Sequence, residues 1–404
     1  MDTAKKRYII IVPDGSADYP INELGQKTIF QAAHIPHIDY LAQNGEIGLV
    51  QTIPEGLPAG SDVANLSVLG YNPQVYYTGR SPLEAASIGV ELKENDIAYR
   101  CNFVTLHDGK MVNFCADHIT TSEADDLIAF LNQQIKNVTD TTIRFYTGTS
   151  YRHLMVWENG DESAVCIPPH DITGQDIESH LPTGDGSDFL KRLQDLSRQI
   201  LTDHPINKAR IKKGKLPANS IWLWGQGRKP NLPTFLEKYH IKGSLISAVD
   251  LLKGIGIYLG LTIISVPGAT GYIDTNYRGK AEYALKALED NDFIFIHIEA
   301  PDEAAHSGNI KAKIRAVEDI DTLIVGTLLS GLKQYSDYHI MLLPDHFTPI
   351  EVMTHTREKV PFLIYKSKEI NKNKPPHEGF HELSAQNSKI VFQDGEKLMN
   401  HFLK

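Results

Sequence analysis

Three short runs of aliphatic side chains each lead to an acidic residue a few positions further on. The runs are residues 8–12 before Asp14, residues 293–298 before Asp302, and residues 339–343 before Asp345. Apolar runs of this length are typical of strands buried on both faces, as in a parallel sheet covered by helices. Helix-like stretches at residues 280–288 and 310–332 alternate with them, which predicts a doubly wound α/β core. Ligands of such sheets bind beyond the carboxyl ends of the strands, so we expect the three carboxylates to share one edge.

The middle of the chain has a different pattern. Short alternating segments, such as residues 103–105, precede a helical pattern at residues 123–134. This mixture predicts an α+β domain inserted into the core. We therefore expect residues 1–74 and 236–404 to form one catalytic α/β core, and residues 75–235 to form a substrate-binding cap domain.

Composition and charge narrow the class of protein. Of the 404 residues, 41% are hydrophobic and 22% are charged, which is ordinary for a globular protein. The net charge of −10 argues against partners such as nucleic acid or an anionic membrane, because both need a basic face. The N-terminus does not resemble a signal peptide, and no apolar run approaches the ~20 residues that span a bilayer. We expect a soluble, cytoplasmic protein.

The segment around Ser61 combines a turn with the start of a helix. Gly60 permits a tight turn, and we expect Ser61 to be the N-cap of a helix that ends near Gly70. A capping serine needs no further role. A nucleophilic serine at the same place would benefit from helix amides that favour developing negative charge, but it would need a base or a metal to react. The segment alone is compatible with both roles.

Aspartate and histidine residues recur where metal ligands are expected. Asp302 and His306 are four residues apart, so on a helix they share one face and can bind one ion. An exposed pair on a solvated helix has the same spacing. Asp345 and His346 directly follow a predicted strand and offer an oxygen and a nitrogen ligand. The candidates with weaker local signals are Asp14, after the first strand, and His355.

This set of side chains predicts a phosphoryl-transfer reaction. Aspartate and histidine ligands without cysteine suit Mn²⁺, Zn²⁺ or Mg²⁺. Two such ions ~4 Å apart would clamp an in-line displacement at phosphorus, and a metal would activate Ser61 at neutral pH. The sequence has no GxxxxGK(S/T) loop, no GxGxxG after the first strand and no GxSxG around Ser61. We expect phosphoryl transfer or phosphate-ester hydrolysis through a phosphoserine.

Several stretches, in the same order along nearly the whole chain, resemble one known family. It is the archaeal-type 2,3-bisphosphoglycerate-independent phosphoglycerate mutase family of the alkaline phosphatase superfamily. The matching stretches are residues 12–15, 60–64, 76–85, 100–103, 204–207, 217–219, 252–256, 299–306 and 344–346. The resemblance implies an alkaline-phosphatase-like doubly wound core sheet with an inserted α+β cap domain.

The resemblance also implies roles for individual residues. Ser61 would be the phosphorylated nucleophile, and two divalent ions, preferably Mn²⁺, with Mg²⁺ or Zn²⁺ as alternatives, would bind beside it. One ion would be held by Asp14, Ser61, Asp345 and His346, and the other by Asp302, His306 and His355. The mutase reaction would need no nucleotide or bisphosphoglycerate cofactor. The residues expected to contact a small phosphorylated metabolite are Arg80, Lys253, Arg152 and Arg228.

The substrate is the point at which alternatives stay open. Residues 113–120 stand where the archaeal mutases carry an arginine-rich stretch, and arginine pairs well with carboxylates. Residues 151–154 and 168–172 instead resemble a bacterial branch of the family proposed to act as homoserine kinases. We favour the interconversion of 3-phosphoglycerate and 2-phosphoglycerate, a step of glycolysis and gluconeogenesis. The alternatives are homoserine phosphorylation in threonine biosynthesis, a metal-dependent phosphatase, and a scaffold that kept the fold and lost catalysis.

Overall fold

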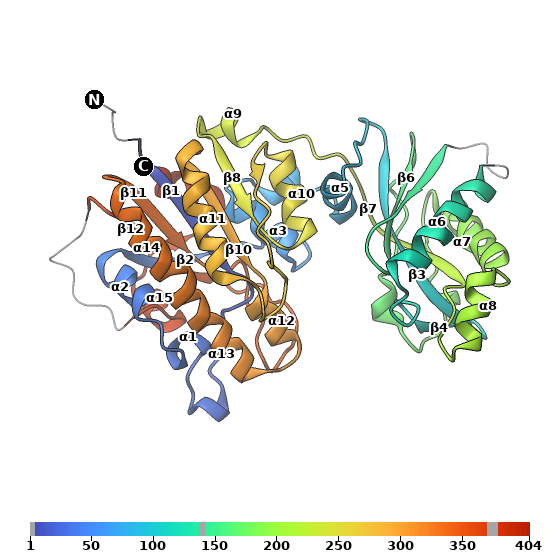
Figure 1. The fold of residues 1–404 in the computed structure, drawn as a ribbon, viewed down its shortest axis with the longest axis horizontal. Coiled ribbons are helices and arrows are strands. Elements are labelled where there is room, and N and C mark those ends of the chain that lie inside the picture. Colours follow the sequence, from blue (N-terminus) through green and yellow to red (C-terminus); the bar gives the residue numbers. More distant parts are fainter. Residues whose placement is uncertain (1–4, 137–141, 370–378) are drawn as a thin grey trace. The chain divides into compact units, whose positions relative to one another are not determined.

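The computed structural model describes residues 5–136, 142–369 and 379–404 (Figure 1). The chain divides into two compact units, a larger one of Met1–Tyr77 with Asn231–Lys404 and a smaller one of Thr78–Pro230. The limits expected from the sequence, after residues 74 and 235, differ from these by three and five residues. That the smaller unit is a cap stays a prediction.

The larger unit is built on one eight-stranded sheet with the order β13-β2-β12-β11-β1-β10-β8-β9. The central strand β1 pairs in parallel with β10 and β11, and β8 and β9 continue the parallel part. Strand β12 runs antiparallel to β11 and to β2. The strands are β1 Arg7–Pro13, β2 Glu46–Val50, β8 Gly243–Ile246, β9 Thr262–Ile263, β10 Phe293–Ile298, β11 Tyr338–Leu342, β12 Val360–Lys366 and β13 Val391–Phe392.

Helices cover both faces of this sheet, as the alternating pattern predicts (Figure 1). Ile9 and Ile11 of β1 belong to one apolar cluster with side chains of α2, α11, α13 and α14. On the other face, the ring of Tyr8 packs edge-on against Phe402 of α16, with 5.7 Å between ring centroids. Consecutive strand residues point to opposite faces, so β1 is buried on both. These covering helices are α2 Pro36–Asn44, α11 Tyr277–Asp290, α13 Ile310–Asp319, α14 Gly326–Gly331 and α16 Gly395–Leu403.

Helices α3 and α10 pack against each other beside α16. They carry two of the residues singled out from the sequence, Ser61 and Lys253. The remaining helices of the larger unit are α1 Ile29–Ala32, α3 Ser61–Val68, α4 Pro73–Tyr76, α9 Phe235–Tyr239, α10 Asp250–Tyr258, α12 Ala300–His306 and α15 Glu382–Asn387.

The helical stretch predicted at residues 310–332 is not one regular helix. A π-helical segment, Ile320–Val325, separates α13 from α14. Within that segment, the buried carboxylate of Asp321 accepts a hydrogen bond from the Ile38 N–H, 2.7 Å away, and contacts His37 Nδ1 at 2.8 Å. Asp321 therefore accepts a backbone N–H of the first turn of α2. Helical periodicity in the sequence cannot predict this tertiary contact.

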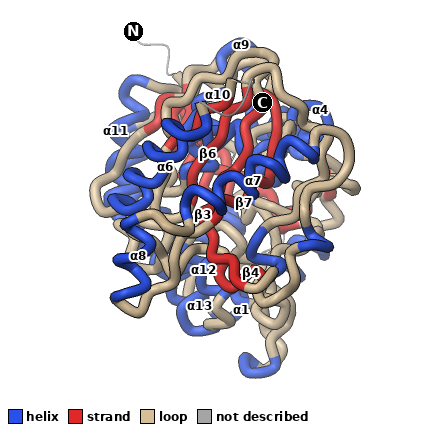
Figure 2. Tube along the Cα trace, turned by 90° about the vertical axis from the view of Figure 1, so that its right-hand side faces the viewer, coloured by secondary structure: helices blue, strands red, loops and turns tan. Residues whose placement is uncertain are grey.

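The smaller unit has a five-stranded antiparallel sheet in which β3 pairs with β4, β6 and β7, and β5 pairs with β6. Helices α6 and α7 cover one face of it (Figure 2), and α5 packs through Ala85 against Ala98 and Val156 on the other. The elements are β3 Ile97–His107, β4 Lys110–Asn113, β5 Ile143–Tyr146, β6 Arg152–Trp157, β7 Ser220–Arg228, α5 Arg80–Ser87, α6 Thr121–Ile135, α7 Ser187–Leu201 and α8 Pro205–Lys212.

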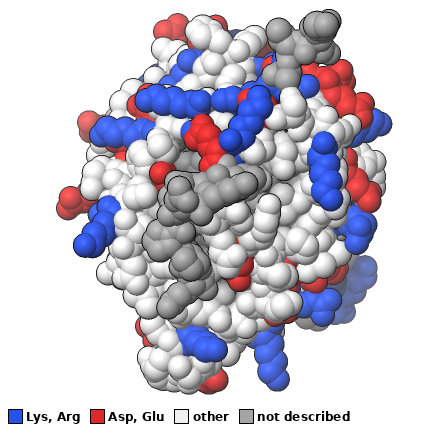
Figure 3. Space-filling model, turned by 90° about the vertical axis from the view of Figure 1, so that its left-hand side faces the viewer, with Lys and Arg blue, Asp and Glu red and all other residues white. Residues whose placement is uncertain are grey.

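The surface carries charges of both signs. Basic and acidic side chains are interspersed on the face drawn in Figure 3. Among the helices of the described residues, we find none long and apolar enough to cross a membrane.

Candidate metal centre and nucleophile

The acidic residues predicted to share one edge of the sheet do so. Strands β1 and β10 end in register, with Pro13 opposite Ile298, and the Asp14 N–H donates to the Ile298 carbonyl at 3.0 Å. Asp14 follows β1 directly, and Asp345 lies just beyond the end of β11. Asp302 lies in the first turn of α12, the helix that begins two residues after β10 (Figure 1). All three carboxylates are buried.

Four of the seven predicted ligands form what we call the inner cluster: Asp14, Ser61, Asp345 and His346. Their contacts converge on one atom, His346 Nε2, which lies 3.1 Å from Ser61 Oγ, 3.3 Å from Asp14 Oδ1 and 3.4 Å from Asp345 Oδ2. The side chains of Asp14, Asp345 and His346 are fully buried. Among the described residues, Asp14 Oδ1 has no hydrogen-bond partner. A buried carboxylate oxygen left in this way suits a cation.

The other three predicted ligands form the outer cluster: Asp302, His306 and His355. Asp302 Oδ2 lies 3.1 Å from His306 Nε2 and 3.5 Å from His355 Nε2, and the two imidazole nitrogens are 3.0 Å apart. The side chain of His306 is 36% exposed and that of His355 20% exposed, so this cluster is more open to solvent than the inner one. One carboxylate and two imidazoles are a common ligand set for a divalent ion.

The two clusters are adjacent. The Thr348 hydroxyl donates to Asp302 Oδ1 at 2.6 Å and lies 3.1 Å from His346 Nδ1. Asp302, His346 and His355 also place ligand atoms within 4.8 Å of one another, as do Asp14, Asp345 and His346. The residues present therefore fit a divalent-metal centre in which Thr348 connects the two ligand sets.

Buried carboxylates of like charge lie close together at this edge of the sheet, so a cation bound there would stabilise them. Burial, together with the nearby Asp345 and Glu299 carboxylates, raises the pKa of Asp14 well above its usual range. Burial would also raise the pKa of Asp302, but hydrogen bonds with His306 and His355 outweigh it and hold that pKa well below the usual range. A divalent ion is often the largest local charge at such a site, and it offsets the repulsion between carboxylates.

Ser61 is not the N-cap of its helix, which corrects the expectation from the sequence. Gly60 is the N-cap, with extended backbone angles of φ −163° and ψ 156°, and Ser61 is the first residue of α3. The serine hydroxyl contacts His346 instead of capping a backbone N–H. Asn65, one turn further along α3, donates from Nδ2 to the Ser61 carbonyl and to Asp345 Oδ2, both at 2.8 Å. Ser61 thus lies at the positive end of a helix that is tied to the inner cluster.

Sequence reasoning missed four residues of this site: Asn65, His297, Glu299 and Thr348. His297 lies inside the apolar run of β10, and its Nε2 is 2.8 Å from Asp14 Oδ2. Burial lowers the pKa of His297 to about 3 and raises that of Glu299 to about 7. A histidine in an otherwise apolar strand was the available signal for His297; the other three have no distinctive spacing.

The predicted substrate-binding residues are engaged in local contacts. Lys253 pairs with Asp250 in the first turn of α10, with 3.0 Å between Nζ and Oδ1. In the smaller unit, Arg80 pairs with Glu84 and Arg228 with Glu162, at 3.1 and 2.7 Å. The remaining one, Arg152, lies with its Nε 3.1 Å from the Tyr151 hydroxyl. Their contacts with substrate stay predictions.

One arginine of the smaller unit was not among those candidates. The buried guanidinium of Arg100 pairs with Glu84 at 3.0 Å and stacks 4.2 Å from the centre of the Trp224 ring. Glu84 therefore forms ion pairs with two arginines, Arg80 and Arg100.

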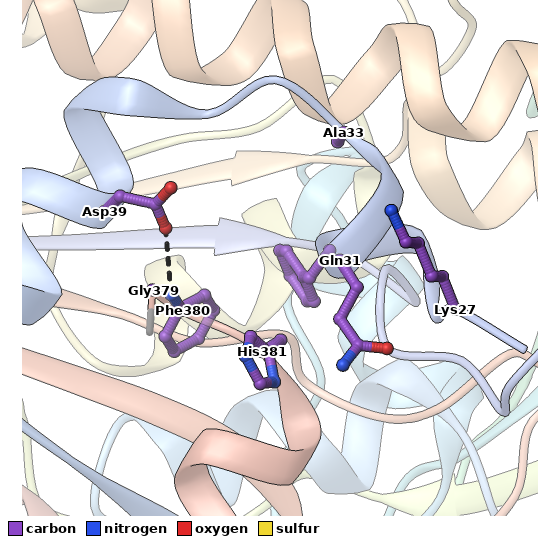
Figure 4. Close-up of a pocket in the computed structure, with 8 residues that line it drawn as sticks. Lys27, Gln31, Ala33, Asp39, Gly379, Phe380 and His381 are labelled. Carbon is purple, nitrogen blue, oxygen red and sulfur yellow. Dashed lines mark hydrogen bonds between the residues drawn. The ribbon is translucent and has the colours of Figure 1, made fainter. Parts of the chain in front are cut away.

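A cavity of about 250 Å³ lies elsewhere in the larger unit and contains none of the predicted site residues. Its lining includes Phe30, Gln31, Asp39 and His381 (Figure 4), and Asp39 accepts the Phe380 N–H at 2.9 Å. The residues singled out from the sequence as ligands and nucleophile therefore lie at the strand ends and not in this cavity.

The fold and the side chains gathered at the strand ends together indicate a class of enzyme. A serine at a helix N-terminus, beside aspartate and histidine ligands at the carboxyl edge of a doubly wound sheet, is the arrangement of a metal-dependent phosphoryl-transfer enzyme.

Comparison with known proteins identifies the family within that class. The family model described as 2,3-bisphosphoglycerate-independent phosphoglycerate mutase matches residues 42–207. A relative from Methanosarcina barkeri bearing the same name is 49% identical over 400 residues, which covers 98% of this chain and 99% of the relative. The chain belongs to the 2,3-bisphosphoglycerate-independent phosphoglycerate mutase family, which confirms the resemblance noted in the sequence.

Solved structures agree with this assignment. The cofactor-independent phosphoglycerate mutase of Thermoplasma acidophilum aligns with a TM-score of 0.67 at 28% identity, over 98% of this chain and 99% of that one. A protein from Pyrococcus horikoshii aligns with a TM-score of 0.82, also at 28% identity, over 99% of this chain and 97% of that one. The α/β architecture expected from the family resemblance is confirmed.

Proposed function

We propose that this protein interconverts 3-phosphoglycerate and 2-phosphoglycerate through a phosphoserine at Ser61. Its family membership supports the reaction, and the relatives from Methanosarcina barkeri and Thermoplasma acidophilum carry the mutase name, so they do not favour the homoserine kinase alternative. The observation that carries the proposal is the position of Ser61 Oγ, 3.1 Å from His346 Nε2 inside the inner cluster.

We assign the inner and outer clusters as the ligands of two divalent ions, with Mn²⁺ as the first choice and Mg²⁺ or Zn²⁺ as alternatives. The mixture of carboxylate oxygens and imidazole nitrogens supports this choice, because it lacks the thiolates that favour softer ions. Ions bound there would neutralise phosphate charge and lower the pKa of a serine hydroxyl.

The chain's own groups support two successive displacements. In the first, Ser61 Oγ loses its proton and bonds to phosphorus, the bond from phosphorus to O3 of the substrate breaks, and O3 takes up a proton. In the second, the 2-hydroxyl of glycerate loses its proton and bonds to phosphorus, the bond from phosphorus to Ser61 Oγ breaks, and Oγ takes up a proton. Asn65 holds the Ser61 backbone, and the N-terminus of α3 favours negative charge at the serine. Two displacements predict net retention of configuration at phosphorus.

We assign the smaller unit as the cap that binds the substrate and excludes water. Exclusion of water would keep the phosphoserine from hydrolysing, which makes the enzyme a transferase and not a phosphatase. Arg80, Arg152 and Arg228 of that unit, with Lys253 of α10, are the proposed contacts for the phosphate and carboxylate of this small metabolite. We place the reaction in the cytoplasm, without nucleic-acid or membrane partners.

The test compares Ser61→Ala with Ser67→Ala, a buried serine of the same helix. One assay couples 2-phosphoglycerate formation to enolase, and a second follows ATP-dependent phosphorylation of homoserine. We expect mutase activity in the wild type and in Ser67→Ala, and its loss in Ser61→Ala. Activity of the wild type in the homoserine assay alone would overturn the proposed reaction.

A further inference from the structure

We propose that His297 is a positioning residue for Asp14. It engages one carboxylate oxygen of Asp14, so that the other oxygen points toward His346 in the inner cluster. The proposal rests on the assignment of Asp14 as a metal ligand under the proposed function. His297 lies on β10 opposite Val12 of β1, two residues before Asp14, and its side chain is fully buried.

The two carboxylate oxygens of Asp14 have different surroundings. Oδ2 lies 2.8 Å from His297 Nε2. Oδ1 lies 3.3 Å from His346 Nε2 and, among the described residues, has no hydrogen-bond partner. The contact with His297 thus occupies one oxygen and leaves the other oxygen directed at the inner cluster. Partners of this kind commonly orient the residues that ligate a metal.

On the other side of the imidazole, a hydroxyl can hold the ring proton at Nε2. The Val249 N–H donates to Ser247 Oγ at 3.0 Å, and this Oγ lies 3.2 Å from His297 Nδ1. Ser247 Oγ accepts from Val249 and has its own hydroxyl proton to donate to Nδ1. A neutral imidazole that accepts at Nδ1 carries its proton at Nε2 and donates it to Asp14.

The backbone of His297 is also held in place. The fully buried Lys280 of α11 donates from Nζ to the His297 carbonyl at 2.8 Å. A chain of contacts therefore runs from Val249, the residue before α10, through Ser247 and the His297 ring to the Asp14 carboxylate. Through this chain of contacts, the start of α10 and the end of β10 both determine how Asp14 is oriented.

The competing role for His297 is that of a ligand. Asp14, His297 and Glu299 place ligand atoms within 4.8 Å of one another. His297 Nε2, however, lies 3.7 Å from Glu299 Oε2 and only 2.8 Å from Asp14 Oδ2, so its close partner is the carboxylate it would orient. The two roles differ in the number of ions bound, which a titration counts.

The test is a calorimetric titration of Mn²⁺ into metal-free, full-length protein. In His297→Leu, we expect the dissociation constant of one of two Mn²⁺ sites to rise by roughly 10- to 100-fold, the usual effect of losing such a partner. His297→Gln, whose amide can donate from a similar position, should recover most of this affinity. Ser247→Ala should weaken the same site by a smaller factor, because only the orienting hydroxyl is lost.

The matched control is His339→Leu, which removes a buried histidine from β11 of the same sheet. It should leave both Mn²⁺ affinities unchanged, and thermal unfolding of the metal-free variants checks that each is folded. Unchanged affinities in His297→Leu, or an equal loss in His339→Leu, would overturn the proposal. A third Mn²⁺ that disappears in His297→Leu would also overturn it, because His297 would then be a ligand.

Ser247→Ala and Asp14→Asn keep the outcome decisive. If His297→Leu does not fold, Ser247→Ala decides: unchanged Mn²⁺ binding in it contradicts an oriented imidazole. Asp14→Asn separates the two proposals, because it should abolish the inner site whatever the role of His297. If Asp14→Asn keeps both sites, the ligand assignment under the proposed function is wrong, and not only the positioning role.

Discussion

The inner and outer clusters show two ways in which one fold holds the side chains that we propose as metal ligands. Three members of the inner cluster are fully buried at strand ends, and Asn65, Gly15 and His297 hold its carboxylates. The outer cluster keeps two histidines partly exposed, one on α12 and one in a loop. We infer from this difference that the sheet pre-organises the inner cluster, whereas the arrangement of the outer cluster would depend more on a bound ion.

The largest effect should come from the inner cluster. Asp345 accepts the Gly15 N–H at Oδ1 and the Asn65 amide at Oδ2, so in Asp345→Asn a new amide group faces existing donors. Losing several kcal/mol of electrostatic stabilisation corresponds to a fall in kcat on the order of 10³-fold. Steady-state kinetics at saturating Mn²⁺ measures it. Activity restored by excess Mn²⁺ would contradict a pre-organised inner cluster.

The next largest effect should come from Lys313, which contacts the loops that follow β1 and β11. The fully buried Lys313 of α13 pairs with Asp18 at 2.8 Å and donates to the Thr348 carbonyl, also at 2.8 Å. Because Lys313→Ala leaves Asp18 buried without its partner, the free energy of unfolding should fall by about 3–5 kcal/mol. Urea denaturation measures this, with the solvent-exposed Lys311→Ala on the same helix as the control.

A smaller and reversible effect should follow from His306→Ala in the outer cluster. One of three ligands is lost at a site that is open to solvent. We expect Mn²⁺ affinity to fall by roughly 10²-fold, about 3 kcal/mol, and activity to return as Mn²⁺ is raised. Titrating activity against Mn²⁺ tests this, and a loss that no Mn²⁺ concentration reverses would remove the contrast between the clusters.

The smallest effect should come from Thr348→Val, because the Thr348 hydroxyl contacts one residue of each cluster. Loss of its hydroxyl leaves Asp302 Oδ1 without a donor at 2.6 Å, so Mn²⁺ affinity should fall by about tenfold. Calorimetry on the variant shows whether one or both sites weaken. An effect confined to the outer site would indicate that the contact with His346 carries little energy.

The sequence predicted those parts of the site that local spacing determines. The strand runs placed Asp14, Asp302 and Asp345 at one edge, and the four-residue spacing placed Asp302 and His306 on one helix. The contact between Ser61 and His346 joins residues 285 positions apart, so only tertiary structure, or a family resemblance, brings them together.

Other parts lay beyond pattern reasoning for physical reasons. Gly60, and not Ser61, is the N-cap of α3, and the Ser61 hydroxyl contacts His346, which no capping preference anticipates. The π-helical segment serves a contact between Asp321 and α2. Arg80 and Arg228 pair with acidic neighbours, whereas the composition alone presents them as free cations.

The most direct test of the central claim is to trap the phosphoenzyme. Mn²⁺-loaded protein is mixed with 3-phosphoglycerate, quenched in acid and analysed by peptide mass spectrometry, with Ser61→Ala and Ser67→Ala in parallel. We expect one added phosphoryl group on Ser61 in the wild type and in Ser67→Ala, and none in Ser61→Ala. A phosphoryl group on another residue, or turnover by Ser61→Ala at the wild-type rate, would contradict it.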